Sequence, residues 1–526
     1  MQLRPLFPSF AAHFSPLFVC RRIGEYYGKI QNRFFIASKG VSMTIKQVKN
    51  YLNGEWKEPH GKEAQNVVNP ATGEIIGNVR FSASDEVDSA VAAAKAAFPE
   101  WRSTPPTTRA RYMFKLKALL EERFDDAARI CTSEVGKTLE ESRGEVRRAI
   151  EVVDVMTGIP TLMKGQSLED ISAGLDCTAF RQPVGVFATI APFNFPFMVP
   201  LWFLPSAIAT GNTILVKPSE QVPLSQQLVF EVLDELSLPP GVVNLVNGGK
   251  ETVQTILAHP DVKGVSFVGS SRVAQYIYSE GARHGKRIQA LGGAKNFIMV
   301  MPDADIKATA KALMGSCLGC AGQRCLAGSN IIAVGDVYSR LRDALLESAR
   351  KIKVGNGLEP ATQMGPIASK KSLERILQMI EAGIKEGAKL ILDGRNAKVP
   401  AYPGGFYLYP CIFDDVKPTM SLAKEEIFGP VISLIKARDF EEAMKMVEEC
   451  PYANAGSIFT SSGKWAREFG YRLPASMCGI NIGVAAPMAF FSFGGSKNSF
   501  YGDLKAHGGE SIDFYTNRKV ISSRWY

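Results

Sequence analysis

The sequence lacks the residue patterns of several common kinds of site. Its five histidines form no HExxH motif and no catalytic triad order, and Cys317 and Cys320 have no second cysteine or histidine pair that would complete a zinc site. No GxGxxG motif is present, so the standard dinucleotide-binding fingerprint is absent. The nine cysteines are odd in number and irregularly spaced, which predicts reduced thiols in a reducing compartment. We therefore expect neither a metal ion nor a disulfide framework.

Charged residues are missing from residues 182–216, a stretch longer than a bilayer requires. Five prolines interrupt any helix through this stretch, and Asn194 and Asn212 would lie in lipid. A buried strand, loop and helix explain it better, so we predict no membrane insertion.

Basic residues are concentrated at the start of the chain. Residues 1–42 contain six lysines and arginines against a single acid, Glu25, and supply more than half of the formal net charge of +9. Aromatic and small residues lie between these charges, which is the composition of an organellar transit peptide and predicts a mitochondrial matrix location. The alternative is an extension with no targeting role. The mild charge of the remaining residues argues against nucleic acid as a partner.

Apolar periodicity predicts an α/β protein of two or three domains. Helices are expected from a cap at Ser84 and over residues 107–131 and 140–155. Strands at residues 185–190, 213–216, 242–246 and 265–268 then alternate with helices at residues 224–236 and 251–258, which predicts a doubly wound parallel sheet of the dinucleotide-binding class. A second series predicts a separate catalytic domain, with strands at residues 297–301, 330–334, 389–393, 406–413, 431–435, 457–460 and 479–482. Residues 510–526 alternate as a strand that would form an exposed edge.

Cys325 is the strongest candidate for chemistry. It lies in the glycine-rich stretch GSCLGCAGQRCLA, residues 315–327, directly after Arg324. A cysteine must ionise to act as a nucleophile, and an electropositive, partly open setting lowers its pKa. Two other interpretations are that Cys317, Cys320 and Cys325 are buried apolar side chains, or that Cys317 and Cys320 form a redox pair.

Five short motifs in one order resemble those of the aldehyde dehydrogenase superfamily. They are Pro192-Phe193-Asn194, Lys217-Pro218-Ser219-Glu220, Phe267-Val268-Gly269-Ser270, the AGQRC segment that ends at Cys325, and Glu426-Ile427-Phe428-Gly429-Pro430. The resemblance implies an aldehyde dehydrogenase fold whose variant Rossmann sheet binds NAD without a GxGxxG motif. It also implies that Cys325 is the catalytic nucleophile and that Asn194 stabilises the oxyanion.

The same resemblance implies which residues hold the cofactor. Lys217 and Glu220 follow a strand and suit the hydroxyls of a ribose, and the Glu220 carboxylate would repel a 2′-phosphate, which favours NAD over NADP. Ser270 opens a helix whose free amides suit a pyrophosphate. The full set of expected NAD-binding residues is Ala191, Phe193, Lys217, Glu220, Gln221, Ser270, Gly292, Glu426 and Phe428.

One position departs from the superfamily pattern. Hydrolytic members carry a glutamate before Leu-Gly-Gly that activates water, whereas Ala290 precedes Leu291-Gly292-Gly293 here. A methyl group cannot accept a proton, so the acyl enzyme needs another acceptor. The chain after residue 42 is similar to the methylmalonate-semialdehyde dehydrogenases, a branch that uses coenzyme A as that acceptor. Two alternatives are a hydrolytic enzyme in which Glu426 or another acid activates water, and a catalytically silent binding or structural protein.

In that branch two arginines hold the substrate carboxylate, and they correspond to Arg148 and Arg324. The resemblance implies oxidative decarboxylation of methylmalonate semialdehyde, or malonate semialdehyde, to propionyl-CoA or acetyl-CoA in valine, pyrimidine or inositol catabolism. It also implies a homotetramer built as a dimer of dimers. The expected organisation is a transit peptide at residues 1–42, an NAD-binding domain at 43–165 and 184–292, a catalytic domain at 293–487, and an oligomerisation arm at 166–183 and 488–526.

Overall fold

The computed structural model describes residues 45–526. The predicted transit peptide at residues 1–42 lies outside the described residues. Within residues 45–526, none of the helices is both long enough and apolar enough to cross a membrane.

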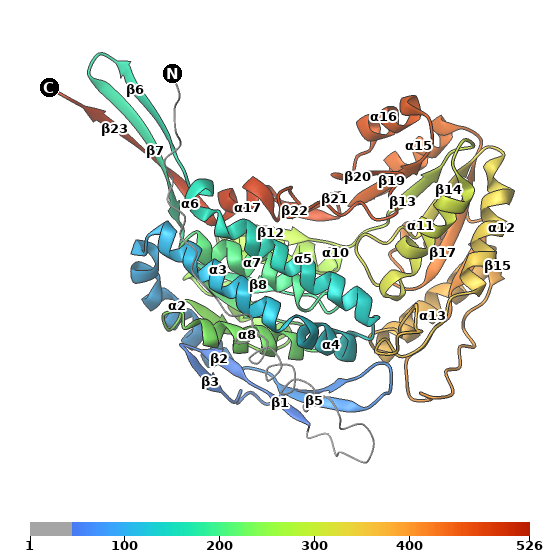
Figure 1. The fold of residues 1–526 in the computed structure, drawn as a ribbon, viewed down its shortest axis with the longest axis horizontal. Helices are drawn as coiled ribbons and strands as arrows, with labels where there is room; N and C mark the ends of the chain where they lie inside the picture. Colours follow the sequence, from blue (N-terminus) through green and yellow to red (C-terminus); the bar gives the residue numbers. More distant parts are fainter. Residues whose placement is uncertain (1–44) are drawn as a thin grey trace, which may run out of the picture. The chain divides into compact units, whose positions relative to one another are not determined.

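The first large sheet has eight strands in the order β22-β12-β11-β8-β9-β10-β2-β3 (Figure 1). Its five central strands are parallel, and the outer strands are antiparallel to their neighbours. The strands are β22 (Phe500–Gly502), β12 (Arg287–Leu291), β11 (Val262–Val268), β8 (Val186–Ile190), β9 (Thr213–Lys217), β10 (Val243–Leu245), β2 (Asn50–Leu52) and β3 (Glu55–Lys57). The predicted doubly wound parallel sheet is therefore present.

Helices cover both faces of this sheet, which is why its strands are apolar throughout. In β9, Ile214 and Val216 pack into one apolar cluster and Leu215 packs into another on the opposite face. The first cluster includes α3 (Pro106–Glu122), α4 (Phe124–Val135), α5 (Leu139–Thr157), α7 (Met198–Ala209) and α8 (Leu224–Leu236). The second includes α2 (Ser84–Ser103), α9 (Lys250–Ala258) and α10 (Ser271–Arg283).

The second large sheet has seven strands in the order β15-β16-β17-β14-β13-β19-β20, and only β15 runs antiparallel. The strands are β15 (Lys389–Leu392), β16 (Cys411–Asp414), β17 (Val431–Ala437), β14 (Asn330–Val334), β13 (Phe297–Val300), β19 (Ala455–Phe459) and β20 (Met477–Ile480). The accompanying helices are α11 (Ile306–Leu318), α12 (Val337–Arg350), α13 (Lys370–Lys385), α15 (Phe440–Glu449) and α16 (Gly463–Arg472). This sheet has its own apolar core, and the second series of strands is confirmed except at residues 406–410, which form no strand because β16 begins only at Cys411. The exact domain boundaries stay a prediction.

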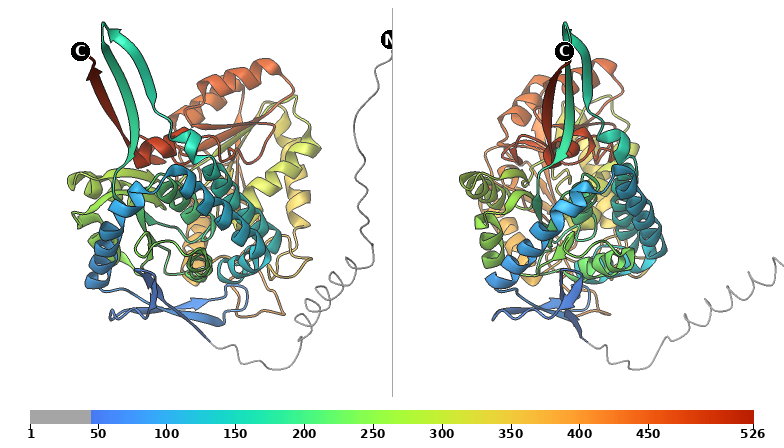
Figure 2. Two further views of the ribbon diagram at one scale, coloured as in Figure 1. Left: turned by 60° about the vertical axis from the view of Figure 1, so that its left-hand side comes forward. Right: turned by 90° about the vertical axis from the view of Figure 1, so that its left-hand side faces the viewer.

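Three strands form an arm that projects from the body (Figure 2). The hairpin of β6 (Gln166–Ser172) and β7 (Leu175–Pro183) pairs with β23 (Thr516–Arg524), which is antiparallel to β7. The strand expected over residues 510–526 is wrong in its first part, because α17 (Gly508–Tyr515) precedes β23. Phe514 and Tyr515 pack against Phe187 of β8, and this burial selects the helix.

Two other boundaries differ from the sequence prediction. The helix expected over residues 107–131 is two helices, because α3 ends and α4 begins at Arg123. Ala83, and not Ser84, caps α2, since the Glu86 carboxylate accepts a hydrogen bond from the Ala83 amide at 2.9 Å. The smaller elements are β1 (Lys46–Val48), β4 (Ala64–Val68), β5 (Ile75–Arg80), α6 (Ile159–Leu162), α14 (Ser421–Lys424), β18 (Tyr452–Ala453) and β21 (Ser496–Lys497).

Candidate active site

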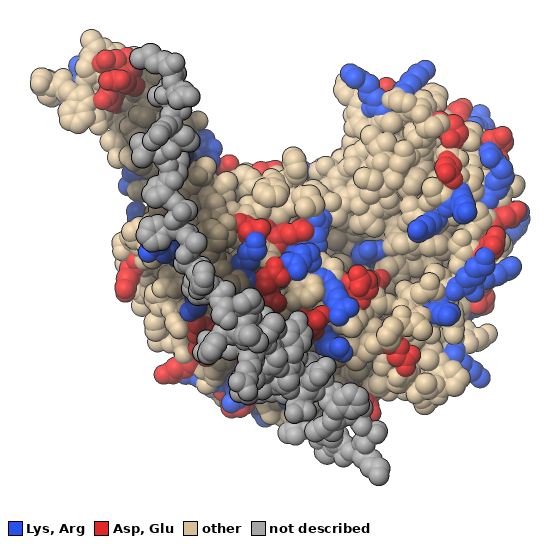
Figure 3. Space-filling model, in the orientation of Figure 1, with Lys and Arg blue, Asp and Glu red and all other residues tan. Residues whose placement is uncertain are grey.

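A deep cleft of about 1460 Å³ contains all of the residues selected from the sequence. Strand ends and loops of the first large sheet supply Ala191, Phe193, Asn194, Lys217, Glu220, Gln221, Ser270 and Gly292, and α5 supplies Arg148. The segments around the second sheet supply Arg324, Cys325, Glu426 and Phe428. On the face drawn in Figure 3, lysines and arginines are interspersed with acids and form no large patch of one sign.

Cys325 follows a tight 3-10 turn (Gly319–Gly322) at the end of α11. Cys320 and Ala321 both have left-handed backbones with φ of 52°, which non-glycine residues adopt at a cost of about 1 to 3 kcal/mol each. The Cys325 carbonyl accepts hydrogen bonds from Asn296 Nδ2 at 2.8 Å and Asn454 Nδ2 at 3.0 Å. These two hydrogen bonds therefore fix the backbone carbonyl of Cys325.

The Cys325 thiol is less acidic than an exposed cysteine. Burial and the Glu426 carboxylate raise its pKa to about 12, against the opposing effects of nearby backbone amides and of Arg324. The electropositive setting expected from Arg324 is therefore outweighed by burial. These effects favour the thiol form of Cys325 over the thiolate.

Asn194 lies in the loop after β8 and is buried. Its side-chain amide donates to the Gln323 carbonyl at 3.0 Å, which ties this loop directly to the segment that carries Cys325. An amide nitrogen has two N–H groups, so this bond leaves a second donor.

Arg148 and Arg324 approach the cleft from different elements. Arg148 Nη2 donates to the Pro487 carbonyl at 2.8 Å, and its Nη1 is 3.3 Å from the Glu151 carboxylate. Arg324 Nη2 donates to the carbonyls of Gly315 and Ser316. The buried Arg324 Nε has no hydrogen-bond partner among the described residues. Arg148 also donates to Met488 Sδ at 3.1 Å and to the Ala486 carbonyl at 3.4 Å, so an anion that binds its Nη atoms competes with these contacts.

The residues expected to bind NAD include a buried lysine, a helix N-cap and a phenylalanine with a left-handed backbone. Lys217 Nζ donates to the Pro218 carbonyl at 2.7 Å and the Gly248 carbonyl at 2.6 Å, and burial lowers the pKa of this lysine. Ser270 is the N-cap of α10, and its side chain makes no capping bond. Phe428 has a left-handed backbone with φ of 58°, and its ring meets that of Phe193 edge to face at 5.8 Å.

Glu426 is an acid of the cleft whose pKa is raised. Burial raises its pKa to about 7, and its carboxylate accepts a hydrogen bond from the Ala294 amide at 2.9 Å. A Cβ at Gly293 would lie 2.4 Å from the Glu426 carboxylate, so a larger residue there would displace this carboxylate.

Ala290 lies in β12 and is fully buried in the apolar cluster that contains Phe267, Ala274 and Ile277. The position that carries the hydrolytic base in the superfamily therefore offers only a methyl group, as the sequence indicates. Other acids do line the cleft: Glu141, Glu145, Glu151, Glu220, Glu425 and Glu426.

The structure adds residues that the sequence reasoning did not select. Lys137 and Glu145 form a buried ion pair beside Asn194. His507 lines the cleft against Trp202, and burial and Arg148 lower its pKa to about 3. No motif marks these residues, and only the fold brings them to the site. Among residues 45–526, no cluster of histidine, cysteine, aspartate or glutamate is suited to hold a metal ion.

Comparisons with known proteins agree on one family. The model of the aldehyde dehydrogenase family matches residues 56–521. Malonate-semialdehyde dehydrogenase 3 of Geobacillus kaustophilus is 47% identical over 480 residues, which cover 91% of this chain and 99% of the relative. The crystal structure of methylmalonate-semialdehyde dehydrogenase from Oceanimonas doudoroffii is 41% identical with a TM-score of 0.90, covering 92% of this chain and 99% of that one. A Sinorhizobium meliloti protein assigned to the same activity and complexed with NAD gives the same values.

Proposed function

Because this chain belongs to the aldehyde dehydrogenase family, we propose that it oxidises malonate semialdehyde or methylmalonate semialdehyde with NAD and transfers the acyl group to coenzyme A with loss of carbon dioxide. The observation that carries this proposal is the arrangement of Arg148 and Arg324 around one cleft with Cys325. Two guanidinium groups beside a nucleophile select an aldehyde that also bears a carboxylate.

The first chemical step is attack of the Cys325 sulfur on the aldehyde carbon, with the thiol proton passing to Glu426, the cleft carboxyl with a pKa of about 7 that acts electrostatically on this sulfur. Charge that develops on the aldehyde oxygen is stabilised by the Asn194 amide and the backbone N–H of Cys325, and one such donor is worth about 3 to 4 kcal/mol. NAD, when bound, accepts the hydride that leaves the resulting hemithioacetal. Lys217 and Glu220 suit the ribose hydroxyls, and the Ser270 end of α10 suits the pyrophosphate.

The second step is transfer of the acyl group from Cys325. The thioester has a β-carboxylate, and its loss as carbon dioxide is eased because the oxyanion donors stabilise the developing enolate. The enolate carbon then takes up a proton from solvent, which gives the acetyl or propionyl thioester on Cys325. The buried methyl of Ala290 cannot activate water, which favours the thiol of coenzyme A as acceptor. Decarboxylation and the acceptor follow from the likeness to the semialdehyde dehydrogenases named above.

The second candidate is a hydrolytic aldehyde dehydrogenase. The observation that favours it is Glu426, a buried carboxyl with a pKa of about 7 that acts electrostatically on Cys325. A general base with this pKa could activate water near neutral pH.

The deciding experiment follows NADH and identifies products from malonate semialdehyde with and without coenzyme A. Sustained NADH formation that requires coenzyme A, with acetyl-CoA and carbon dioxide as products, supports the proposal. Free malonate formed without coenzyme A identifies the hydrolytic alternative. Absence of any aldehyde-dependent NADH, together with a titratable Cys325, identifies the catalytically silent alternative.

Location and assembly are further parts of the proposal. The basic composition of residues 1–42 favours the mitochondrial matrix, whereas the relatives named above come from bacteria. The arm favours assembly into a dimer of dimers, because β6 and β23 each have an unpaired edge and the arm exposes large apolar side chains: Leu168, Ile171, Phe180, Val520, Ile521 and Trp525. Sedimentation of the purified protein measures the number of subunits.

A further inference from the structure

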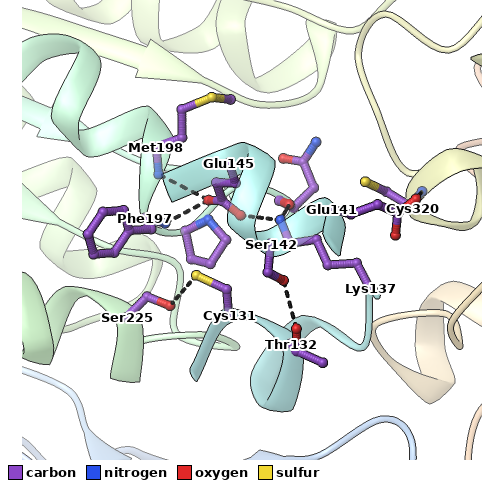
Figure 4. A network of polar contacts seen from close by, with 12 residues as sticks. Cys131, Thr132, Lys137, Glu141, Ser142, Glu145, Phe197, Met198, Ser225 and Cys320 are labelled. Carbon is purple, nitrogen blue, oxygen red and sulfur yellow. Dashed lines mark hydrogen bonds and ion pairs between the residues drawn. The ribbon is translucent and has the colours of Figure 1, made fainter. Parts of the chain in front are cut away.

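Helix α5 contacts both of the loops that carry the candidate catalytic groups. Glu141, Glu145 and Arg148 are spaced by four and three residues, so they share one face of the helix, and all three line the cleft. Arg148 is the candidate substrate arginine. The two acids below it have no role in the chemistry described above, yet each makes a specific contact with one of the loops (Figure 4).

Glu145 holds the loop of Asn194. Its carboxylate accepts hydrogen bonds from the amides of Phe197 at 2.9 Å and Met198 at 3.0 Å, at the start of α7. The same carboxylate pairs with Lys137, whose Nζ donates to the Asn194 carbonyl at 2.9 Å. The Lys137 ammonium also lies 4.4 Å from the centre of the Phe195 ring. The buried Lys137–Glu145 pair therefore contacts four residues of the segment 194–198, which carries the proposed oxyanion donor.

Glu141 holds the loop of Cys325. Its carboxylate accepts a hydrogen bond from the Cys320 amide at 2.6 Å and another from the Thr138 amide at 2.9 Å. The Cys320 amide belongs to the left-handed turn that leads to the nucleophile. Since such a backbone conformation is unfavourable, a strong charge-assisted contact at this amide stabilises the turn.

We propose that Glu141, and the Glu145–Lys137 pair one turn further along α5, are positioning residues that set the distance between the Cys325 sulfur and the Asn194 amide. Removing either Lys137 or Glu145 alone would leave an unpaired buried charge and destabilise the folded protein, so the two residues are best replaced together. The hydrogen bond from the Asn194 side chain to the Gln323 carbonyl links the two loops directly. The proposal rests on the proposed function for the roles of Cys325 and Asn194.

The test is the pre-steady-state burst of NADH from malonate semialdehyde in the absence of an acyl acceptor. This burst reports attack and hydride transfer only, so it does not depend on whether coenzyme A or water accepts the acyl group. For Glu141→Ala we expect the burst rate to fall about 10- to 100-fold, because a misplacement of about 1 Å costs about that much. The KM for NAD should stay within about threefold, since the cofactor residues are untouched.

Two variants of the same helix complete the test. Glu141→Gln keeps a carbonyl oxygen that can accept from Cys320, so it should recover most of the burst rate. Glu140→Ala removes the neighbouring carboxylate, which is exposed and does not line the cleft, and should leave the burst unchanged. A wild-type burst rate in Glu141→Ala, or an equal loss in Glu140→Ala, overturns the proposal.

The other loop is tested with the double variant Lys137→Met and Glu145→Gln. It removes both buried charges and keeps an acceptor for the Phe197 and Met198 amides, so the loop loses only the Lys137 ammonium, which contacts the Asn194 carbonyl and the Phe195 ring. We expect a folded enzyme whose burst rate falls about tenfold. An unchanged burst rate in this variant contradicts the role assigned to Lys137. A wild-type enzyme that releases free acid without coenzyme A contradicts the proposed function and leaves this test intact.

Discussion

Arg148 offers the sharpest test of substrate recognition. Replacing one partner of a buried charge pair costs about 2 to 5 kcal/mol. The side chain of Arg148 keeps 30% of its surface exposed and already contacts Glu151, so we expect a cost at the lower end of this range. A loss of about 2 kcal/mol corresponds to a fall of about 30-fold in kcat/KM, because 1.4 kcal/mol is a factor of ten. We therefore expect Arg148→Gln to lose about this much with malonate semialdehyde.

The assay compares malonate semialdehyde with propanal, which has no carboxylate. Arg148→Gln should lose activity with the acidic aldehyde only. Arg147→Gln is the matched control, because Arg147 is the neighbouring residue and pairs with Glu121 of α3 outside the cleft, at 3.0 Å. Equal losses with both aldehydes, or a similar selective loss in Arg147→Gln, would refute the assignment of Arg148 to the substrate carboxylate.

Three further predictions concern charge in the cleft. Glu220→Gln should raise kcat/KM for NADP by about tenfold relative to NAD, since it removes one negative charge near the ribose; an unchanged cofactor ratio places the 2′-hydroxyl elsewhere. Because the pKa of Cys325 is raised to about 12, the rate of its alkylation by iodoacetamide in the absence of NAD should still increase above pH 10. The Cys325→Ala variant measures the background alkylation of the exposed Cys478, and a rate that reaches a plateau near pH 8 contradicts the prediction. The Glu426 carboxyl has a pKa of about 7 in the folded protein and near 4.5 in the unfolded chain, so its contribution to the unfolding free energy should fall by about 3 kcal/mol between pH 4 and pH 8. In chemical denaturation, Glu426→Gln should reduce this dependence of the unfolding free energy on pH.

The sequence predicts the fold well where its signal is local. Continuous apolar runs such as residues 213–216 require cover on both faces, and helical stretches of suitable length follow them in the chain. The family motifs lie at the ends of these strands, where loops from parallel strands meet, so the candidate residues converge on one cleft. The α/β fold and the membership of the family are confirmed.

The errors come from contacts that are distant in the chain. Residues 510–515 alternate in polarity like a strand, but packing of Phe514 and Tyr515 against Phe187 makes them a helix. The sequence shows Arg324 next to Cys325 and predicts an acidic thiol, yet burial has the larger effect on the pKa. Lys137 and Asn194 are 57 positions apart, and no local pattern connects them.

The pairing of β7 with β23 constrains the order of events during synthesis. Cys177 and Ser522 face each other across this ladder and are 345 positions apart in the chain. At about 5 to 20 residues per second, a ribosome needs about 17 to 70 seconds to make the intervening segment. During that time β7 has a free edge beside an exposed Phe180, which is a template for pairing with other nascent chains. The arm is thus completed late, and chaperone protection matters most in that interval.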